Sequence, residues 1–124
     1  MVRERNSAVV ATLVLVGLLV LHCKMVEAVT HVVGGESGWT YGVQTWPYKK
    51  KFKAGDTLVF NYSPKEHNVV SARKKEYDKC NPSYDSKVYN TGHDKIIVKK
   101  GENYFISGFK GQCASGLKLF VHAE

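Results

Sequence analysis

Short runs of β-branched and aromatic residues, separated by turn residues, are the feature that most constrains the fold of this 124-residue chain. No long stretch has the apolar period of an amphipathic helix, and we expect a single helical turn over residues 74–79. The runs predict roughly seven strands. Their spans are residues 31–33, 50–53, 57–62, 68–72, 94–99, 103–107 and 117–122. Short strands at this spacing predict an all-β fold, a Greek-key β-sandwich.

The first 28 residues predict a secretory signal peptide. Arg3 and Arg5 precede an apolar run over residues 8–21, and the segment closes on Val26-Glu27-Ala28, with small or modest side chains at the positions that signal peptidase reads. The run is about 14 residues long, shorter than the roughly 20 that a membrane-spanning helix needs, so a membrane anchor is the less favoured alternative. We expect cleavage after Ala28, which leaves residues 29–124 as one secreted, extracellular domain without a transmembrane anchor.

Two cysteines remain in the predicted mature chain, Cys80 and Cys113, and they are 33 residues apart. An isolated pair in the secretory pathway most often forms a disulfide. A cysteine-based metal site is the alternative, and the absence of a CxxC motif disfavours it.

The charge of the predicted mature chain is strongly positive. Residues 29–124 contain 15 Lys and Arg against 9 Asp and Glu, a net charge of +6. Such a charge attracts polyanions, and outside a cell these are acidic polysaccharides or anionic lipid headgroups rather than nucleic acid. Each lysine cluster taken singly is better explained as a solvated turn. The summed charge therefore predicts a weak preference for polyanions.

Several motifs, in order and in spacing, resemble the phytocyanins, the plant branch of the cupredoxins, and within them the basic blue proteins or plantacyanins. The matching motifs are VVGGESGW (32–39), WP (46–47), FKAGDTLVFNYSPKEHNVV (52–70), CN (80–81) and the segment 87–116. The resemblance covers essentially all of residues 29–124. It implies a cupredoxin-like Greek-key β-sandwich, a copper-binding electron-transfer ancestry, and one disulfide between Cys80 and Cys113 beside the metal end.

The resemblance also assigns four positions to a type 1 copper site: two histidines, a cysteine and an axial methionine or glutamine. In this chain they are His67, Ser107, Gln112 and Leu117, and the last three keep the family spacing of five residues. Only His67 retains a ligand. A serine hydroxyl does not replace a soft thiolate, an amide oxygen suits hard ions, and leucine has no donor atom. We therefore expect no blue copper centre, with copper as the cofactor only if the family function persists.

Packing and hydrogen bonds are expected to replace coordination at these positions. Leucine nearly conserves the volume of methionine, and serine is close in size to cysteine. We expect Ser107, Gln112 and His67 to hydrogen-bond one another or a trapped water, which satisfies their polar groups. Such a cluster explains why the loop persists without its metal donors.

The function predicted from these features is that of a secreted, monomeric, non-enzymatic phytocyanin, which binds or signals at the cell wall or extracellular matrix. The partner is an acidic polysaccharide or an extracellular protein, contacted by the basic surface and by the loop end. At that end we expect contacts from Tyr84, Phe109, Lys110 and Gln112. The rival interpretation is a blue-copper electron carrier with rearranged ligands, and a third is a colourless copper or zinc scavenger built on His67.

Other candidate sites are weaker. An enzymatic serine–histidine pair of Ser107 and His67 is disfavoured, because no GxSxG motif surrounds the serine and no acidic partner for the histidine is evident. His31, His93 (in a turn over 91–94) and His122 are read as ordinary surface or strand residues. The sequon at Asn61 is followed by Pro64, so we expect it to stay unglycosylated.

Overall fold

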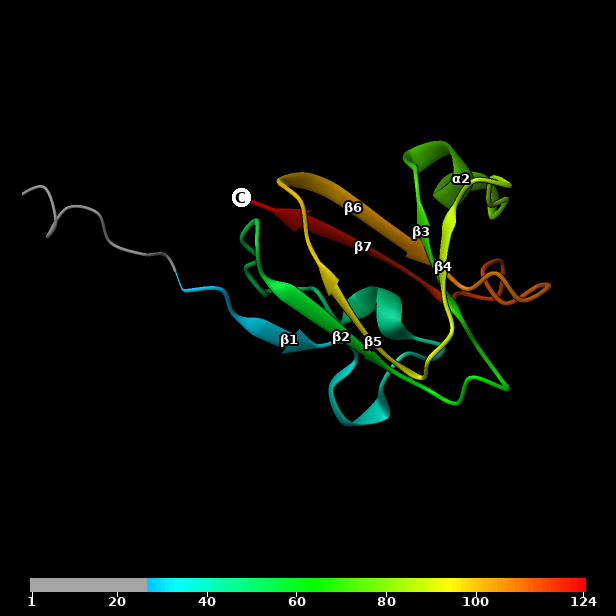
Figure 1. The fold of residues 1–124 in the computed structure, drawn as a ribbon, viewed down its shortest axis with the longest axis horizontal. Coiled ribbons are helices and arrows are strands. Elements are labelled where there is room, and N and C mark those ends of the chain that lie inside the picture. Colours follow the sequence, from blue (N-terminus) through cyan, green and yellow to red (C-terminus); the bar gives the residue numbers. More distant parts are fainter. Residues whose placement is uncertain (1–26) are drawn as a thin grey trace, which may run out of the picture.

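The computed structural model describes residues 27–124, so nearly all of the predicted signal peptide lies outside it. In this part of the chain, seven strands form two sheets that pack face to face, and one short α-helix follows β3 (Figure 1). The elements are β1 (Thr30–Val32), β2 (Thr57–Asn61), β3 (Val69–Ala72), α2 (Lys74–Lys79), β4 (Lys87–Tyr89), β5 (His93–Ile97), β6 (Gly101–Ile106) and β7 (Lys118–Ala123), with short 3-10 turns η1 (Gly35–Ser37) and η2 (Val43–Thr45). None of the helices in residues 27–124 has the length and apolar character needed to cross a membrane.

One sheet has the strand order β1-β2-β5 and the other β4-β3-β6-β7. β1 pairs with β2 in parallel, and all other neighbours are antiparallel. β2 is therefore the centre of the smaller sheet, which explains why its apolar run is buried along almost its whole length. β4 and β5 are edge strands of different sheets, and they leave one side of the sandwich open.

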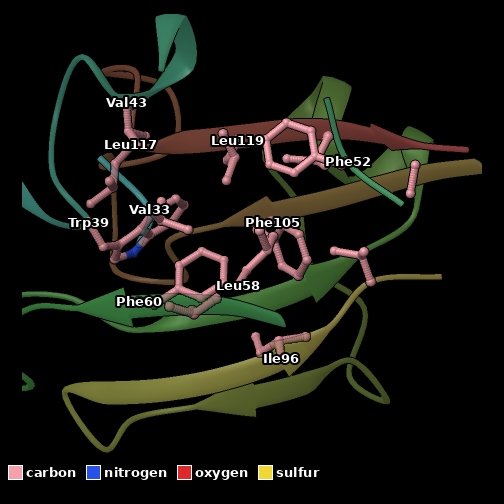
Figure 2. Close-up of a cluster of buried hydrophobic side chains, with 14 residues drawn as sticks. Val33, Trp39, Val43, Phe52, Leu58, Phe60, Ile96, Phe105, Leu117 and Leu119 are labelled. Carbon is pink, nitrogen blue, oxygen red and sulfur yellow. The ribbon is translucent and has the colours of Figure 1, made fainter. Parts of the chain in front are cut away.

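The main apolar core joins the two sheets (Figure 2). β7 shows how the sequence builds it: Leu119, Val121 and Ala123 point inward, and the residues between them point outward, because side chains alternate along a strand. The rings of Trp39 and Phe60 meet edge to face with their centroids 5.1 Å apart. Such aromatic contacts add to the stability gained by burying apolar area.

The β1–β2 connection folds across the end of the core and is fastened there by Trp39. Its backbone N–H donates to the carbonyl oxygen of Asn61 at 2.8 Å, and its indole Nε1–H donates to the carbonyl oxygen of Asn68 at 2.9 Å. Gly38 makes this approach possible: its φ is 72°, and a Cβ on it would lie 2.5 Å from the Asn61 oxygen. The segment that leads to His67 and Asn68 is thus attached directly to the core.

The disulfide implied by the resemblance is present, between Cys80 and Cys113, with the two Cα atoms 5.5 Å apart. It packs against Val70 and Ile106 in a second, smaller buried cluster. Because Cys80 follows α2 and Cys113 lies in the β6–β7 loop, the disulfide ties that loop to the helix.

Six of the predicted strands and the helical turn at 74–79 are confirmed, with ends shifted by up to two residues. The prediction of a strand over 50–53 is wrong. Phe52 forms only an isolated bridge with Ala123, and the chain turns directly after Lys53, whose N–H donates to the side chain of Asp56. The edge strand β4 was not predicted; it is three residues long and leaves Val88 half exposed.

Candidate functional site at the β6–β7 loop

The loop from Ser107 to Leu117 is bonded to itself through its backbone. The Ser107 N–H donates to the Leu117 carbonyl oxygen at 3.0 Å, and the Leu117 N–H donates to the Gln112 carbonyl oxygen at 2.9 Å. The Gln112 N–H donates in turn to the carbonyl oxygen of Phe109 at 3.2 Å. These bonds use only backbone atoms, so the three positions at 107, 112 and 117 are held together whatever their side chains are.

The carboxamide of Gln112 lies at the centre of the site. Its Oε1 accepts a hydrogen bond from Ser107 Oγ at 2.6 Å and lies 3.0 Å from His67 Nδ1. Its Nε2 donates to the Glu66 carbonyl oxygen at 2.7 Å. A backbone carbonyl only accepts, so this last bond fixes which end of the amide faces His67, and Nδ1 of His67 must be the donor. We call this cluster the His67–Gln112–Ser107 trio.

The trio satisfies the polar groups that burial would otherwise leave unpaired. His67 and Ser107 are both buried, and in residues 27–124 no buried side-chain nitrogen or oxygen lacks a hydrogen-bond partner. With a proton on Nδ1, a neutral His67 has its lone pair on Nε2. The edge of the Tyr41 ring covers the imidazole at a centroid distance of 5.8 Å. The hydrogen bonds expected from the sequence are therefore present, with Gln112 as their common acceptor.

Leu117 belongs to the apolar core. It is fully buried, and it shares the main cluster with Val33, Trp39 and Val43 (Figure 2). A leucine side chain offers no donor atom to a metal. The position that the resemblance assigns to the axial ligand therefore serves packing.

The donor atoms at the four positions do not match type 1 copper, which takes a thiolate and two imidazoles. His67 contributes the one imidazole, and its Nδ1 is already hydrogen-bonded. The sulfur of Cys113 is in the disulfide. Across the described residues, no group of three or more His, Cys, Asp or Glu side chains is placed to hold a metal ion.

The Ser107 hydroxyl donates to Gln112, and its hydrogen bond is therefore not directed at His67. A nucleophilic serine needs a hydrogen bond to its base, and here the candidate base, His67, directs its Nδ1 to the same Gln112 amide oxygen. This geometry does not support a serine–histidine catalytic pair.

The predicted contact residues lie on two loops. Phe109, Lys110 and Gln112 share the β6–β7 loop, and Phe109 is half-buried. Tyr84 lies on the α2–β4 loop and is fully exposed. No hydrogen bond or aromatic contact among the described residues joins it to the other three.

The remaining histidines each have a partner of their own. His31 Nε2 lies 2.9 Å from Asp56 Oδ2, and His122 Nδ1 lies 2.9 Å from Glu102 Oε1. His93 was expected in a turn, but it begins β5, where its Nδ1 contacts the side-chain oxygen of Asn61. The sequence analysis did not identify the buried Asp56. The available signal was an acidic residue directly before a strand with an apolar centre.

Comparison with known proteins agrees with this architecture. A family profile described as a plastocyanin-like domain matches residues 38–117. Chemocyanin from Lilium longiflorum is 46% identical over 118 residues, which cover 95% of this chain and 93% of the relative. The basic blue protein of Cucumis sativus is 47% identical over 93 residues, covering 75% of this chain and 97% of that protein.

Solved structures give the same result. Cucumber basic protein, a blue copper protein, superposes with a TM-score of 0.75 at 46% identity, covering 77% of this chain and 99% of that one. Cucumber stellacyanin superposes with a TM-score of 0.68 at 28% identity, covering 78% and 96%. With its two packed sheets and one disulfide, this chain belongs to the phytocyanin family and has the cupredoxin-like β-sandwich fold.

Proposed function

We propose that this chain is a secreted, non-enzymatic phytocyanin that has lost three of the four type 1 copper ligands and acts by binding in the cell wall or extracellular matrix. The observation that carries the proposal is the His67–Gln112–Ser107 trio. In it the amide oxygen of Gln112 is hydrogen-bonded both to His67 Nδ1, the nitrogen that a metal at this site would bind, and to the Ser107 hydroxyl. Leu117, buried in the core, supports it.

The energetic balance disfavours copper at this site. A metal on His67 Nδ1 would displace its hydrogen bond to Gln112 and disturb the acceptor that Ser107 uses. Each buried polar group left without a partner costs about 1–3 kcal/mol. No thiolate is available to offset this cost, because a serine hydroxyl stays protonated near neutral pH. A blue-copper electron carrier with rearranged ligands would have to overcome both obstacles.

Titration of the mature protein with Cu(II) tests the loss of the copper site. We expect no intense blue colour and only weak binding, because the thiolate-to-copper absorption requires a coordinated cysteine. A His67→Ala variant is the control: unchanged weak binding assigns it to surface histidines, whereas lost binding assigns it to a colourless site on His67. One tightly held copper per molecule, in natural protein isolated without added metal, would contradict the proposal.

We place the polyanion-binding surface on the open side of the sandwich, not at the loop end. Two adjoining hollows lie there, one of about 670 Å³ between β4 and β5 and one of about 430 Å³ beside α2, and both include Arg73 and Glu76 in their lining. We call this surface the basic face. Its lysines are Lys75, Lys79, Lys87, Lys95 and Lys99.

The acidic residues of the basic face already have partners. Arg73 Nη2 lies 3.1 Å from Glu76 Oε1 and 3.6 Å from Asp85 Oδ1, and Glu102 contacts His122. None of the five lysines forms an ion pair with a residue in 27–124. Their charges can therefore meet an external anion, and a linear polysaccharide with repeated carboxylates can contact several of them at once. At the loop end, exposed Tyr84 and half-buried Phe109 remain candidates for contact with a sugar ring or a protein partner.

Exchanging three lysines for glutamine tests the location of this surface. The variant Lys87→Gln/Lys95→Gln/Lys99→Gln is expected to leave a pectate column at lower salt than wild type and to bind about tenfold more weakly, because exposed ion pairs are individually small and screened by salt. The matched control is Lys49→Gln/Lys51→Gln/Lys65→Gln, which removes the same charge from exposed positions elsewhere. Equal losses in the two variants would mean that only net charge matters. If retention of the wild-type protein on the column did not depend on salt, the proposal of a polyanion partner would be wrong.

A further inference from the structure

A buried carboxylate lies next to the start of the folded domain. Asp56 is only 2% exposed and accepts three hydrogen bonds. Its Oδ1 accepts from the Val29 N–H at 3.0 Å, and its Oδ2 from the Lys53 N–H at 3.0 Å and from His31 Nε2 at 2.9 Å. The carbonyl oxygen of Val29 in turn accepts from the Thr57 N–H at 3.0 Å. Val29 is thus held on both sides of its backbone.

The peptide bond that we expect signal peptidase to cut is the one directly before Val29. Ala28 and Val29 are both exposed, so this bond lies at the surface of the domain. Hydrolysis adds the elements of water: the hydroxyl goes to the Ala28 carbonyl carbon and a proton to the Val29 nitrogen. The new amine then takes up a second proton near neutral pH, since the pKa of an α-amino group is about 7.7–8.0.

We propose that cleavage after Ala28 converts the Val29–Asp56 hydrogen bond into an ion pair, and that Asp56 is the binding site for the mature amino terminus. The pairing fastens β1 to β2 only once the leader is gone. The proposal rests on the secretion that forms part of the proposed function, but it does not depend on copper or on any binding partner.

The surroundings of Asp56 suit this role. Burial on its own would raise the pKa of Asp56, but the hydrogen bonds from Val29, His31 and Lys53 outweigh it and hold that pKa below its usual value, so the carboxylate is ionised at neutral pH. His31 is the one titratable side chain of the described residues that bonds to it; Lys53 contributes its backbone N–H. An ammonium group on Oδ1 is therefore met by a negative charge.

The site is selective for a chain that starts at Val29. If one more residue remained, the nitrogen at 3.0 Å from Oδ1 would still be a neutral amide, and the ammonium would lie one residue away, about 3.8 Å along the chain. A start one residue later would remove the Val29 nitrogen. The geometry therefore distinguishes the predicted mature terminus from both neighbours.

The ion pair predicts a defined pH window. The carboxylate raises the folded-state pKa of the α-amino group, so the stabilisation is fully present below the unfolded value of about 7.7–8.0 and is lost as pH rises through the raised value. The pKa of Asp56 is lowered, so its contribution is present above the usual carboxyl pKa of 3.8 and is lost as pH falls through the lowered pKa.

The test compares residues 29–124 that begin at Val29 with the same chain that retains Ala28, each with and without Asp56→Asn. All strands and both buried clusters of the described chain lie between Thr30 and Ala123, so this length contains the whole fold. Urea unfolding at about pH 6 should show a folding equilibrium constant roughly tenfold larger for the Val29 start. The difference should vanish at about pH 10 and in the Asp56→Asn background.

A difference that persists at high pH, or with Asp56→Asn, would overturn the pairing. If Asp56→Asn does not fold, a Val29 chain with an acetylated α-amine takes its place, and it must behave like the Ala28 start. Amino-terminal sequencing of protein secreted from the full 124-residue precursor gives the second readout. A mature start other than Val29 overturns the Asp56 proposal and leaves the proposed function untouched. Blue colour with Cu(II) overturns the proposed loss of the copper site and leaves the Asp56 proposal untouched.

Discussion

The variant Ser107→Cys/Gln112→His/Leu117→Met is expected to bind Cu(II) tightly and turn intensely blue, while the wild-type protein stays colourless. These substitutions supply the thiolate, the second imidazole and the weak axial sulfur that type 1 copper takes. The backbone bonds from Ser107 to Leu117 and from Leu117 to Gln112 already hold the three positions at the required spacing. Removing the Gln112 amide also frees His67 Nδ1.

Visible absorption and copper content per protein, measured during titration, check this result. The matched control is Gln112→His/Leu117→Met, which adds an imidazole and a thioether but no thiolate, and it should bind copper without the blue band. A count of one free thiol before copper is added shows that Cys80 and Cys113 remain paired. If the triple variant folded but stayed colourless, side chains alone would not account for the missing site.

Removing the disulfide is expected to cause the largest loss of stability. Cys80→Ala/Cys113→Ala should lower the free energy of unfolding by about 3–4 kcal/mol, because the disulfide closes a loop of 33 residues in the unfolded chain. For a small domain, whose total stability is roughly 5–15 kcal/mol, that is a large fraction. The loss of buried sulfur from the cluster with Val70 and Ile106 adds to the effect.

Urea unfolding of the double variant against the oxidised wild type measures this loss. A Gln44→Ala variant is a suitable control, since Gln44 donates a single exposed hydrogen bond to the same loop, to the Gly116 carbonyl oxygen at 3.2 Å. It should cost well under 1 kcal/mol, as surface substitutions usually do. A double cysteine variant as stable as this control would mean that the unfolded chain is not constrained by the disulfide.

The fold could be predicted where a strand carries its own signal. β2 and β7 have clear patterns, one with a continuous apolar centre and one alternating, and both lie within one residue of their predicted positions. β4 has only three residues and an exposed Val88, so its sequence does not differ from that of a loop. Residues 50–53 have a strand-like composition, but the chain turns at Ala54 and Gly55, and Phe52 forms only an isolated bridge with Ala123.

The candidate site was located by spacing, because positions 107, 112 and 117 keep the five-residue interval of the resemblance. The sequence also predicted hydrogen bonds among Ser107, Gln112 and His67. It did not identify Gln112 as the shared acceptor, since that depends on the Glu66 carbonyl oxygen, which lies 46 residues away in sequence. The role of Asp56 was not predicted for the same reason, because its partners Val29 and His31 precede it by 27 and 25 residues.

The self-bonded backbone between Ser107 and Leu117 makes the shape of the β6–β7 loop independent of metal supply. Because the loop closes through its own amide groups, the pairing of Cys80 with Cys113 is the one covalent step that this end of the described fold requires. The loop should therefore have the same shape in protein made with and without copper.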